Sequence, residues 1–300
     1  MHSFKLTLAL VALGIVGSQT ATAQPPFGAQ GAEGEPNRMQ QWLVPSPDLA
    51  TTPHALLFRP PGDGPFRLAV IAHASTQNVL RRAQMPQPEY RALAGWLVAR
   101  GFAVLVPERP GHGATGGKYL EDQGGCDEAD YLSAGRATAD EIAAAVGLVR
   151  KQDFIRQDGI VVIGHSAGAW GALALASESP RDVAAIIAFA PGRGGHANDL
   201  PNQVCAPHTL MSAAALFGKA ARVPVTWLVA ANDSYFSTTL SKQLAEAFRG
   251  GGGGKVEFRV LAASGSEGHW LAETEAGVKI AGPELDRALK PLTPTAARKR

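Results

Sequence analysis

The sequence has few of the residues that metal centres and nucleic-acid-binding surfaces require. Its 300 residues contain only two cysteines, and no two of its eight histidines stand four positions apart as in a zinc-binding helix. Lys and Arg number 28 and Asp and Glu 26, so the formal net charge is only +2. A nucleic-acid footprint needs basic residues gathered on one face. We therefore predict no metal ion, no other cofactor and no nucleic-acid partner.

Long hydrophobic runs are also missing. The longest candidate, residues 6–17, falls short of the roughly 20 apolar residues that span a bilayer. It follows a short charged end with Lys5 and precedes Ala21-Thr22-Ala23, an order typical of a secretory signal peptide. We predict a signal peptide over residues 1–23, cleaved after Ala23. The mature protein is then secreted or periplasmic, with no stable membrane insertion.

Export changes the interpretation of the two cysteines, because an oxidising compartment permits a disulfide. Cys126 and Cys205 allow one pairing. Closing a loop of this length would stabilise the fold by roughly 4 to 5 kcal/mol in the chain-entropy model. We predict this disulfide; two buried free thiols are the alternative.

The chain divides into an irregular arm, one large domain and a short tail. Residues 24–53 carry six prolines and no clear periodicity, which indicates an arm on the surface. Over residues 54–290, short apolar runs alternate with amphipathic stretches, and residues 291–300 form a basic tail. The predicted strands are His54 to Phe58, Leu68 to His73, Ala103 to Pro107, Ile160 to Gly164, Ala184 to Ala190, Val225 to Ala230 and Val256 to Leu261. The predicted helices are Tyr90 to Arg100, Ser133 to Lys151, Ala167 to Glu178, Thr209 to Ala221 and Thr238 to Arg249.

This order of elements predicts an α/β fold with a mostly parallel central sheet and helices on both faces. Two segments interrupt the alternation, residues 108–132 and 191–207, and each contains one cysteine. Both follow a strand, and in open α/β sheets ligands bind beyond the carboxyl ends of the strands. We therefore expect these two loops to form the walls of the functional site.

One motif points to nucleophilic chemistry. The run Gly164-His165-Ser166-Ala167-Gly168 follows an apolar strand and opens a helix rich in Ala and Leu. This is G-x-S-x-G in the strand, turn and helix context that it requires. Such a tight turn leaves room only for small residues at its ends and projects the central side chain from the crest of the sheet. We predict that Ser166 is a nucleophile; an ordinary glycine-rich turn is the alternative.

A serine nucleophile needs a base, and the base needs a carboxylate that orients it. Asp233 follows the strand that ends at Ala230, and His269 follows a small-residue loop after the last strand. We predict Asp233 and His269 as these partners. Competing histidines are His112, His196 and His208, while His165 should point away from the nucleophile. Competing carboxylates are Asp182 and, above all, Asp199.

Acyl transfer also needs donors for the negatively charged oxygen of its tetrahedral intermediate. The backbone N–H of Ala167, directly after the nucleophile, is the first candidate. The second should lie in the loop after the early strand, where Ser75 is our choice and Ala74 the fallback.

The chain resembles the α/β-hydrolase superfamily and, within it, the dienelactone-hydrolase-like esterases over roughly residues 54–290. The segments that carry this resemblance are His73-Ala74-Ser75, Gly164-His165-Ser166-Ala167-Gly168, Asn232-Asp233 and Gly268-His269-Trp270. The resemblance implies hydrolysis of carboxylic esters through an acyl-enzyme. True dienelactone hydrolases carry cysteine at the elbow where Ser166 stands here, so their lactone specificity is not carried over.

These observations predict an exported serine hydrolase that cleaves a small-molecule ester or related acyl compound. A peptidase or amidase of the same fold would need the same three side chains. A binding module that keeps a hydrolase scaffold is the hypothesis from another class, and a missing member of the triad would be its signature.

Overall fold

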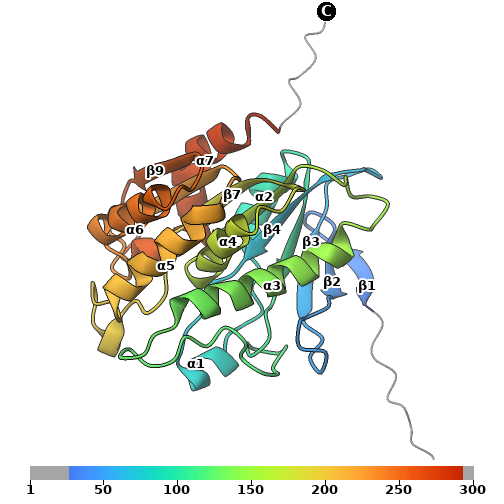
Figure 1. Ribbon diagram of the computed structural model, residues 1–300. Helices are drawn as coiled ribbons and strands as arrows, with labels where there is room; N and C mark the ends of the chain where they lie inside the picture. Colours follow the sequence, from blue (N-terminus) through green and yellow to red (C-terminus); the bar gives the residue numbers. More distant parts are fainter. Residues whose placement is uncertain (1–26, 293–300) are drawn as a thin grey trace, which may run out of the picture.

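One sheet of nine strands organises residues 27–292, the part of the chain that this computed structural model describes (Figure 1). The strands are β1 (Gly28–Gly34), β2 (Met39–Leu43), β3 (His54–Phe58), β4 (Arg67–Ala72), β5 (Phe102–Pro107), β6 (Ile160–His165), β7 (Val183–Phe189), β8 (Val225–Ala230) and β9 (Val256–Leu261). Their order in the sheet is β1-β2-β3-β5-β4-β6-β7-β8-β9. The predicted signal peptide and nearly all of the predicted tail lie outside the described residues.

The sheet is mostly parallel, as predicted. From β5 through β4 to β9 every neighbouring pair is parallel, whereas β1, β2 and β3 pair antiparallel at one edge. The strand order reverses direction around β4, and the segments after β4 and β6 therefore diverge to opposite faces. A crevice opens at such a switch point, beyond the carboxyl ends of the strands.

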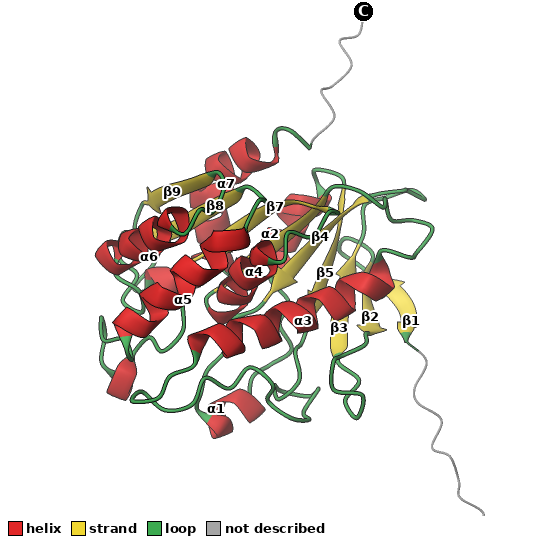
Figure 2. Cartoon of the chain, viewed as in Figure 1, coloured by secondary structure: helices red, strands yellow, loops and turns green. Residues whose placement is uncertain are grey.

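Helices cover both faces of the sheet, and Figure 2 shows the resulting layers. The helices are α1 (Val79–Ala83), α2 (Arg91–Val98), α3 (Tyr131–Val149), α4 (Ala167–Ser177), α5 (Pro207–Ala220), α6 (Thr238–Gly250) and α7 (Glu275–Leu289). The side chains of α3, α4, α5 and α6 share one apolar core, and those of α2 and α7 share the other. In β6, Val162 belongs to the first core and Val161 to the second, because successive strand side chains alternate between faces. A strand covered on both faces is apolar throughout, and this made the central strands recognisable.

The predicted irregular arm requires a correction. Residues 28–43 form β1 and β2, which add to the edge of the sheet through the pairing of Trp42 with Ala55. The side chain of Trp42 is buried against Phe154. Edge strands are exposed on one side and carry glycine and polar residues, so the two-residue hydrophobic alternation is absent from the sequence of β1.

Two helices were not predicted. Helix α7 contains Pro283, which normally argues against a helix, but its apolar face packs through Val278 and Leu285 against the core beside α2. Helix α1 has only five residues and lies apart from the layers, at the lower edge of Figure 1. Within residues 27–292 no helix combines the length and apolar character needed to cross a membrane.

Candidate active site

Ser166 occupies a sharp turn between β6 and α4. Its backbone dihedrals, φ 54° and ψ −117°, lie in a region that residues with a side chain rarely adopt. Such a conformation costs on the order of 1 to 3 kcal/mol and persists only where the surroundings impose it. Here its own backbone is held from β7, since the N–H of Ser166 donates to the carbonyl of Phe189 at 2.9 Å.

The two glycines of the motif have a steric explanation. A Cβ atom on Gly164 would lie 2.2 Å from the Cα of Ala169, and one on Gly168 would lie 2.1 Å from the carbonyl oxygen of Ala72. Both distances are far below any real contact. The close approach of α4 to β6 and β4 therefore requires glycine at both ends of the turn, as predicted.

His269 and Asp233, which lie 36 positions apart in the sequence, form a hydrogen-bonded pair. Nδ1 of His269 lies 3.0 Å from Oδ2 of Asp233, and both side chains are buried. The other carboxylate oxygen of Asp233 accepts the backbone N–H groups of Tyr235 and Phe236 at 2.8 and 2.9 Å. The carboxylate therefore holds the proton on Nδ1 and leaves Nε2 of His269 as a hydrogen-bond acceptor.

The electrostatic setting keeps this imidazole neutral. Burial lowers the pKa of His269 below its ordinary value, and it outweighs the hydrogen bond and negative charge of Asp233, which raise the pKa. A neutral imidazole with a free Nε2 is the form that accepts a proton from a serine hydroxyl.

Glu267 connects the loop of His269 to the loop of Asp233 through hydrogen bonds. Its carboxylate accepts the backbone N–H of His269 at 2.9 Å and that of Ser234 at 3.1 Å. Gly268 lies so close to Asn232 that a Cβ atom there would be 2.5 Å from the Asn232 side-chain oxygen. Sequence reasoning missed the role of Glu267, whose only signal was its place two residues before the histidine.

The competing residues have other roles. Asp199 is exposed and pairs with Arg81 at 3.1 Å, and Asp182 pairs with Arg150 at 2.6 Å, so neither contacts His269. His196 stacks on Tyr235 with ring centroids 3.6 Å apart, and Tyr235 in turn stacks on His269 at 4.2 Å. His208 is exposed near the start of α5.

The predicted oxyanion donors, Ala167 and Ser75, line the same cavity as Ser166 and His269. Ala167 is the first residue of α4, so its N–H has no acceptor within the helix. The N–H of Ala74, the fallback, donates instead to the hydroxyl of Tyr90 at 3.2 Å. Of the two candidates in this loop, Ser75 is therefore favoured.

The side chain of Ser75 is held by His112, which was considered as a base. The hydroxyl lies 2.7 Å from Nε2 of His112, while Nδ1 faces the carbonyl oxygen of Arg109 at 3.0 Å. Nδ1 must carry the proton, so Nε2 accepts from Ser75. Burial lowers the pKa of His112 to about 4, which keeps this imidazole neutral. His112 thus holds the side chain of Ser75 in the loop of the predicted oxyanion donors.

A buried cluster of charges lies next to this loop. Glu121 receives hydrogen bonds from both Arg109 and Arg193, and Arg109 also donates to the carbonyl of His73 at 2.9 Å. Burial alone would raise the pKa of Glu121, but the two guanidinium groups outweigh it and hold the pKa below its usual range. Sequence reasoning missed this cluster, because nothing in the sequence indicates that charges in two different loops meet.

A cavity of about 1270 Å³ contains the site. The loops predicted as its walls do line it, and so do residues 73–78, which include the predicted oxyanion loop, and residues 85–91, which were not predicted. Tyr119 and Tyr235 face this cavity, whereas Tyr131 and Trp170 are buried and do not line it. Within residues 27–292, no three His, Cys, Asp or Glu side chains are arranged to hold a metal ion.

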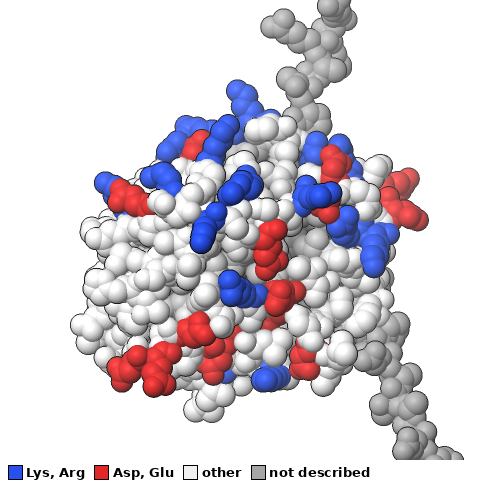
Figure 3. Space-filling view, in the orientation of Figure 1, with Lys and Arg blue, Asp and Glu red and all other residues white. Residues whose placement is uncertain are grey.

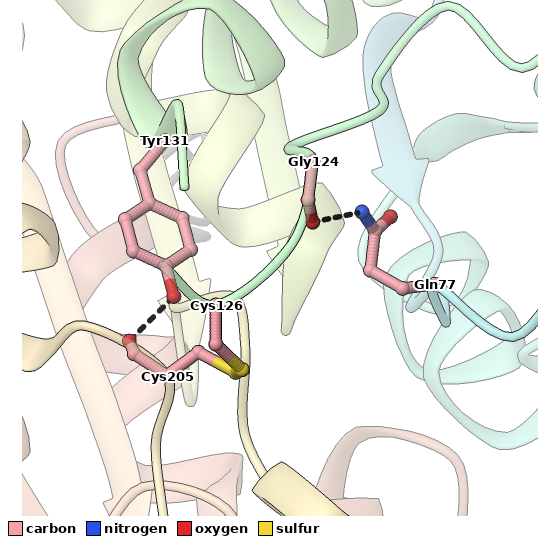
Figure 4. Close-up of a disulfide and its surroundings, with 5 residues drawn as sticks. All are labelled: Gln77, Gly124, Cys126, Tyr131 and Cys205. Carbon is pink, nitrogen blue, oxygen red and sulfur yellow. Dashed lines mark hydrogen bonds between the residues drawn. A yellow bond between two sulfur atoms is a disulfide. The ribbon is translucent and has the colours of Figure 1, made fainter. Parts of the chain in front are cut away.

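The disulfide between Cys126 and Cys205 is present and lies in the cavity wall (Figure 4). Beside it the hydroxyl of Tyr131 donates to the carbonyl of Cys205 at 2.5 Å, and Gln77 donates to the carbonyl of Gly124. The disulfide thus joins the two irregular loops, as predicted, and the two hydrogen bonds connect these loops to α3 and to the segment before α1.

On the face drawn in Figure 3, most Lys and Arg side chains lie over the upper part of the molecule.

Loss of this disulfide should weaken both the fold and the site. Reduction, or the double substitution Cys126→Ser/Cys205→Ser, should lower the free energy of unfolding by up to about 4 to 5 kcal/mol, because a closed loop is released in the unfolded chain. Activity should fall as well, since both loops line the cavity. Thermal unfolding and kcat/KM with and without reductant measure the two effects, and the double variant, which reductant should not affect, is the control. Unchanged values for both would show that the bond does not hold these loops.

Comparisons with known proteins agree with this architecture. The family model described as serine aminopeptidase, S33, matches residues 87–222, just under half of the chain. An esterase of Pyrococcus furiosus has a TM-score of 0.61 at 15% identity, covering 90% of this chain and 99% of its own. Est1E of Butyrivibrio proteoclasticus, solved with ferulic acid bound, has a TM-score of 0.58 at 16% identity, with 83% and 98% covered. A putative dipeptidyl aminopeptidase IV of Bacteroides ovatus has a TM-score of 0.61 at 11% identity, with 84% and 35% covered. No curated protein matches the chain.

Together, the sheet, the strained serine turn and these likenesses show that the chain has the α/β-hydrolase fold. It is a hydrolase of the serine type. The finer resemblance to dienelactone-hydrolase-like esterases stays a prediction.

Proposed function

We propose that this protein is an exported serine esterase that uses Ser166, His269 and Asp233 as a catalytic triad. The observation that carries the proposal is the buried, neutral His269, held at 3.0 Å by Asp233, in the same cavity as a serine on a strained turn. Export rests on the predicted signal peptide and is supported by the disulfide, a bond that is rare in a reducing cytosol.

The proposed reaction has two halves. Nε2 of His269 takes the proton of Ser166 as the hydroxyl oxygen attacks the acyl carbon, and the backbone N–H groups of Ala167 and Ser75 stabilise the tetrahedral oxyanion. His269 then gives the proton to the departing alkoxide, which leaves an ester between the acyl group and Ser166. Water, deprotonated by His269, attacks this acyl-enzyme and releases the acid. Asp233 stabilises the imidazolium in both halves.

Peptide hydrolysis is a second candidate, because the matching family model is described as a serine aminopeptidase and one similar structure is described as a putative dipeptidyl aminopeptidase. Ester hydrolysis is favoured, because several similar structures are described as esterases. This chain covers nearly the whole length of each of them.

Two measurements on the mature protein, residues 24–300, test the proposal. We expect a series of p-nitrophenyl esters of increasing acyl length to be hydrolysed with higher kcat/KM than aminoacyl p-nitroanilides. We also expect a fluorophosphonate to label the protein at Ser166 and to leave Ser166→Ala unlabelled. Faster cleavage of the anilides would establish the peptidase instead. A folded wild-type protein that neither labels nor turns over would be a binding module.

A further inference from the structure

A second hydrogen-bonded group lies behind the serine turn and plays no part in the reaction described above. Its members are Tyr90, at the start of α2, His165, at the end of β6, and Glu273, after the loop of His269. The hydroxyl of Tyr90 lies 2.9 Å from Nδ1 of His165 and 3.3 Å from Oε1 of Glu273. Tyr90 and His165 are buried, while Glu273 is partly exposed at the wall of the cavity.

Two further contacts of this group reach the segments that carry the proposed catalytic groups. The hydroxyl of Tyr90 accepts the backbone N–H of Ala74 at 3.2 Å, directly before the proposed oxyanion donor Ser75. At the other end of the group, Nε2 of the His165 imidazole lies 2.8 Å from the backbone carbonyl oxygen of His269. His165 itself is the residue before Ser166. The nucleophile, the base and the oxyanion loop are therefore connected through one phenol and one imidazole.

The positions of the protons follow from these partners. A carbonyl oxygen only accepts, so Nε2 of His165 carries a proton and donates to His269. Oε1 of Glu273 accepts the hydroxyl proton of Tyr90 and also lies 3.1 Å from Nδ1 of His165. Burial raises the pKa of Tyr90 well above its ordinary value, so the hydroxyl keeps this proton. Every polar atom that Tyr90 and His165 offer in this group has a partner.

The backbone of Tyr90 supports a specific role. It precedes α2 with φ 46° and ψ 39°, the left-handed region that bulky residues rarely occupy, and its side chain does not cap the helix. Strain of this kind, of order 1 to 3 kcal/mol, persists where surrounding contacts determine the conformation. Tyr90 is held here by the packing of its ring in the core beside α2, by its carbonyl, which accepts the N–H of Ala94, and by its hydroxyl, which contacts Ala74, His165 and Glu273.

We propose that Tyr90 is a positioning residue, which acts with His165 to set the oxyanion loop and the loop of His269 relative to Ser166. This proposal rests on the proposed function, because the three segments that it connects are those of the esterase reaction. A misplacement of about 1 Å between such segments can cost about 100-fold in rate. Removing the hydroxyl should therefore affect the transition state and leave ground-state binding nearly unchanged.

The test is Tyr90→Phe, which removes only the hydroxyl. We expect kcat for the ester to fall about 10- to 100-fold with little change in KM, when rates are divided by the concentration of active sites titrated with a fluorophosphonate. Affinity for a boronic acid, which imitates the tetrahedral intermediate, should fall with kcat. A merely structural role would instead lower the melting temperature and the titrated fraction, and leave kcat per active site unchanged.

A second variant tests the contact of His165 with His269 separately from the contacts of Tyr90. His165→Asn keeps a polar atom where Nδ1 stands but removes the contact with His269. We expect it to lower kcat as well, and we expect the double variant with Tyr90→Phe to lose less than the product of the two effects. Trp42→Phe is the control, because it removes a buried N–H group that donates to Gln40 at 3.0 Å within β2, away from the cavity. It should lose stability without losing kcat per active site.

The outcomes distinguish the two proposals. A wild-type protein that does not hydrolyse esters overturns the proposed function. A wild-type enzyme that is active, with Tyr90→Phe equally active per titrated site, overturns the positioning role alone. If Tyr90→Phe does not fold, His165→Asn decides: unchanged kcat and boronic acid affinity in that variant would overturn the proposal.

Discussion

Replacing Ser166 with alanine should reduce kcat for ester hydrolysis by about 10⁶-fold, the loss found when a triad nucleophile is removed. The physical reason is that no other hydroxyl stands on the strained turn between β6 and α4 within the cavity. Some rate above that of water should remain, because Ala167 and Ser75 would still offer their N–H groups to the reacting carbonyl. The measurement is kcat with a p-nitrophenyl ester, together with fluorophosphonate labelling.

Two further variants make this prediction specific. Ser177→Ala changes the same side chain at the end of the same helix, where its hydroxyl bonds only the carbonyl of Ala174, and should leave kcat unchanged. Ser166→Gly should be as inactive as Ser166→Ala but more stable by on the order of 1 kcal/mol, because glycine adopts a positive φ without strain. Retained activity in Ser166→Ala would mean that the nucleophile lies elsewhere.

Asp233→Asn should reduce kcat by about 10⁴-fold without unfolding the protein. The remaining carbonyl oxygen can still accept the N–H groups of Tyr235 and Phe236, so the turn after β8 keeps its shape. The new amide, however, can donate to Nδ1 of His269. That shifts the imidazole proton to Nε2, where it blocks acceptance of the proton from Ser166. Steady-state kinetics and thermal unfolding measure the two parts of this prediction.

The dependence on pH gives an independent readout of the same pair. Burial lowers the pKa of His269, so the acid limb of kcat/KM in the wild-type protein should lie below pH 6.5. Asp233 raises that pKa, and the residual activity of Asp233→Asn should therefore persist to still lower pH. Asp182→Asn, at a carboxylate paired with Arg150, is the matched control. A larger loss in Asp199→Asn than in Asp233→Asn would show that the wrong carboxylate was assigned.

The central strands could be predicted because burial on both faces leaves a local signal. Strands β3 and β8 begin and end at the residues predicted from their apolar runs, and β6 extends only one residue further, to His165. Strand β1, at one edge of the sheet, and its neighbour β2 were not recognised, because their sequences are rich in glycine and polar residues. Strand β9, at the other edge, was recognised because polar Glu257 and Arg259 alternate there with apolar residues. Helix α7 was missed for the opposite reason, since tertiary packing overrides the local signal of Pro283.

The sequence by itself determined the position of each candidate catalytic residue after a strand, because the turn around Ser166 and the loops of Asp233 and His269 are encoded by short neighbouring segments. Only the tertiary structure decided which groups hold them. Tyr90 and His165 are 75 positions apart, and Arg193 and Glu121 are 72 apart. Such partners depend on how the loops meet beyond the sheet, and long-range hydrogen bonds between single side chains leave no periodicity or motif in one sequence.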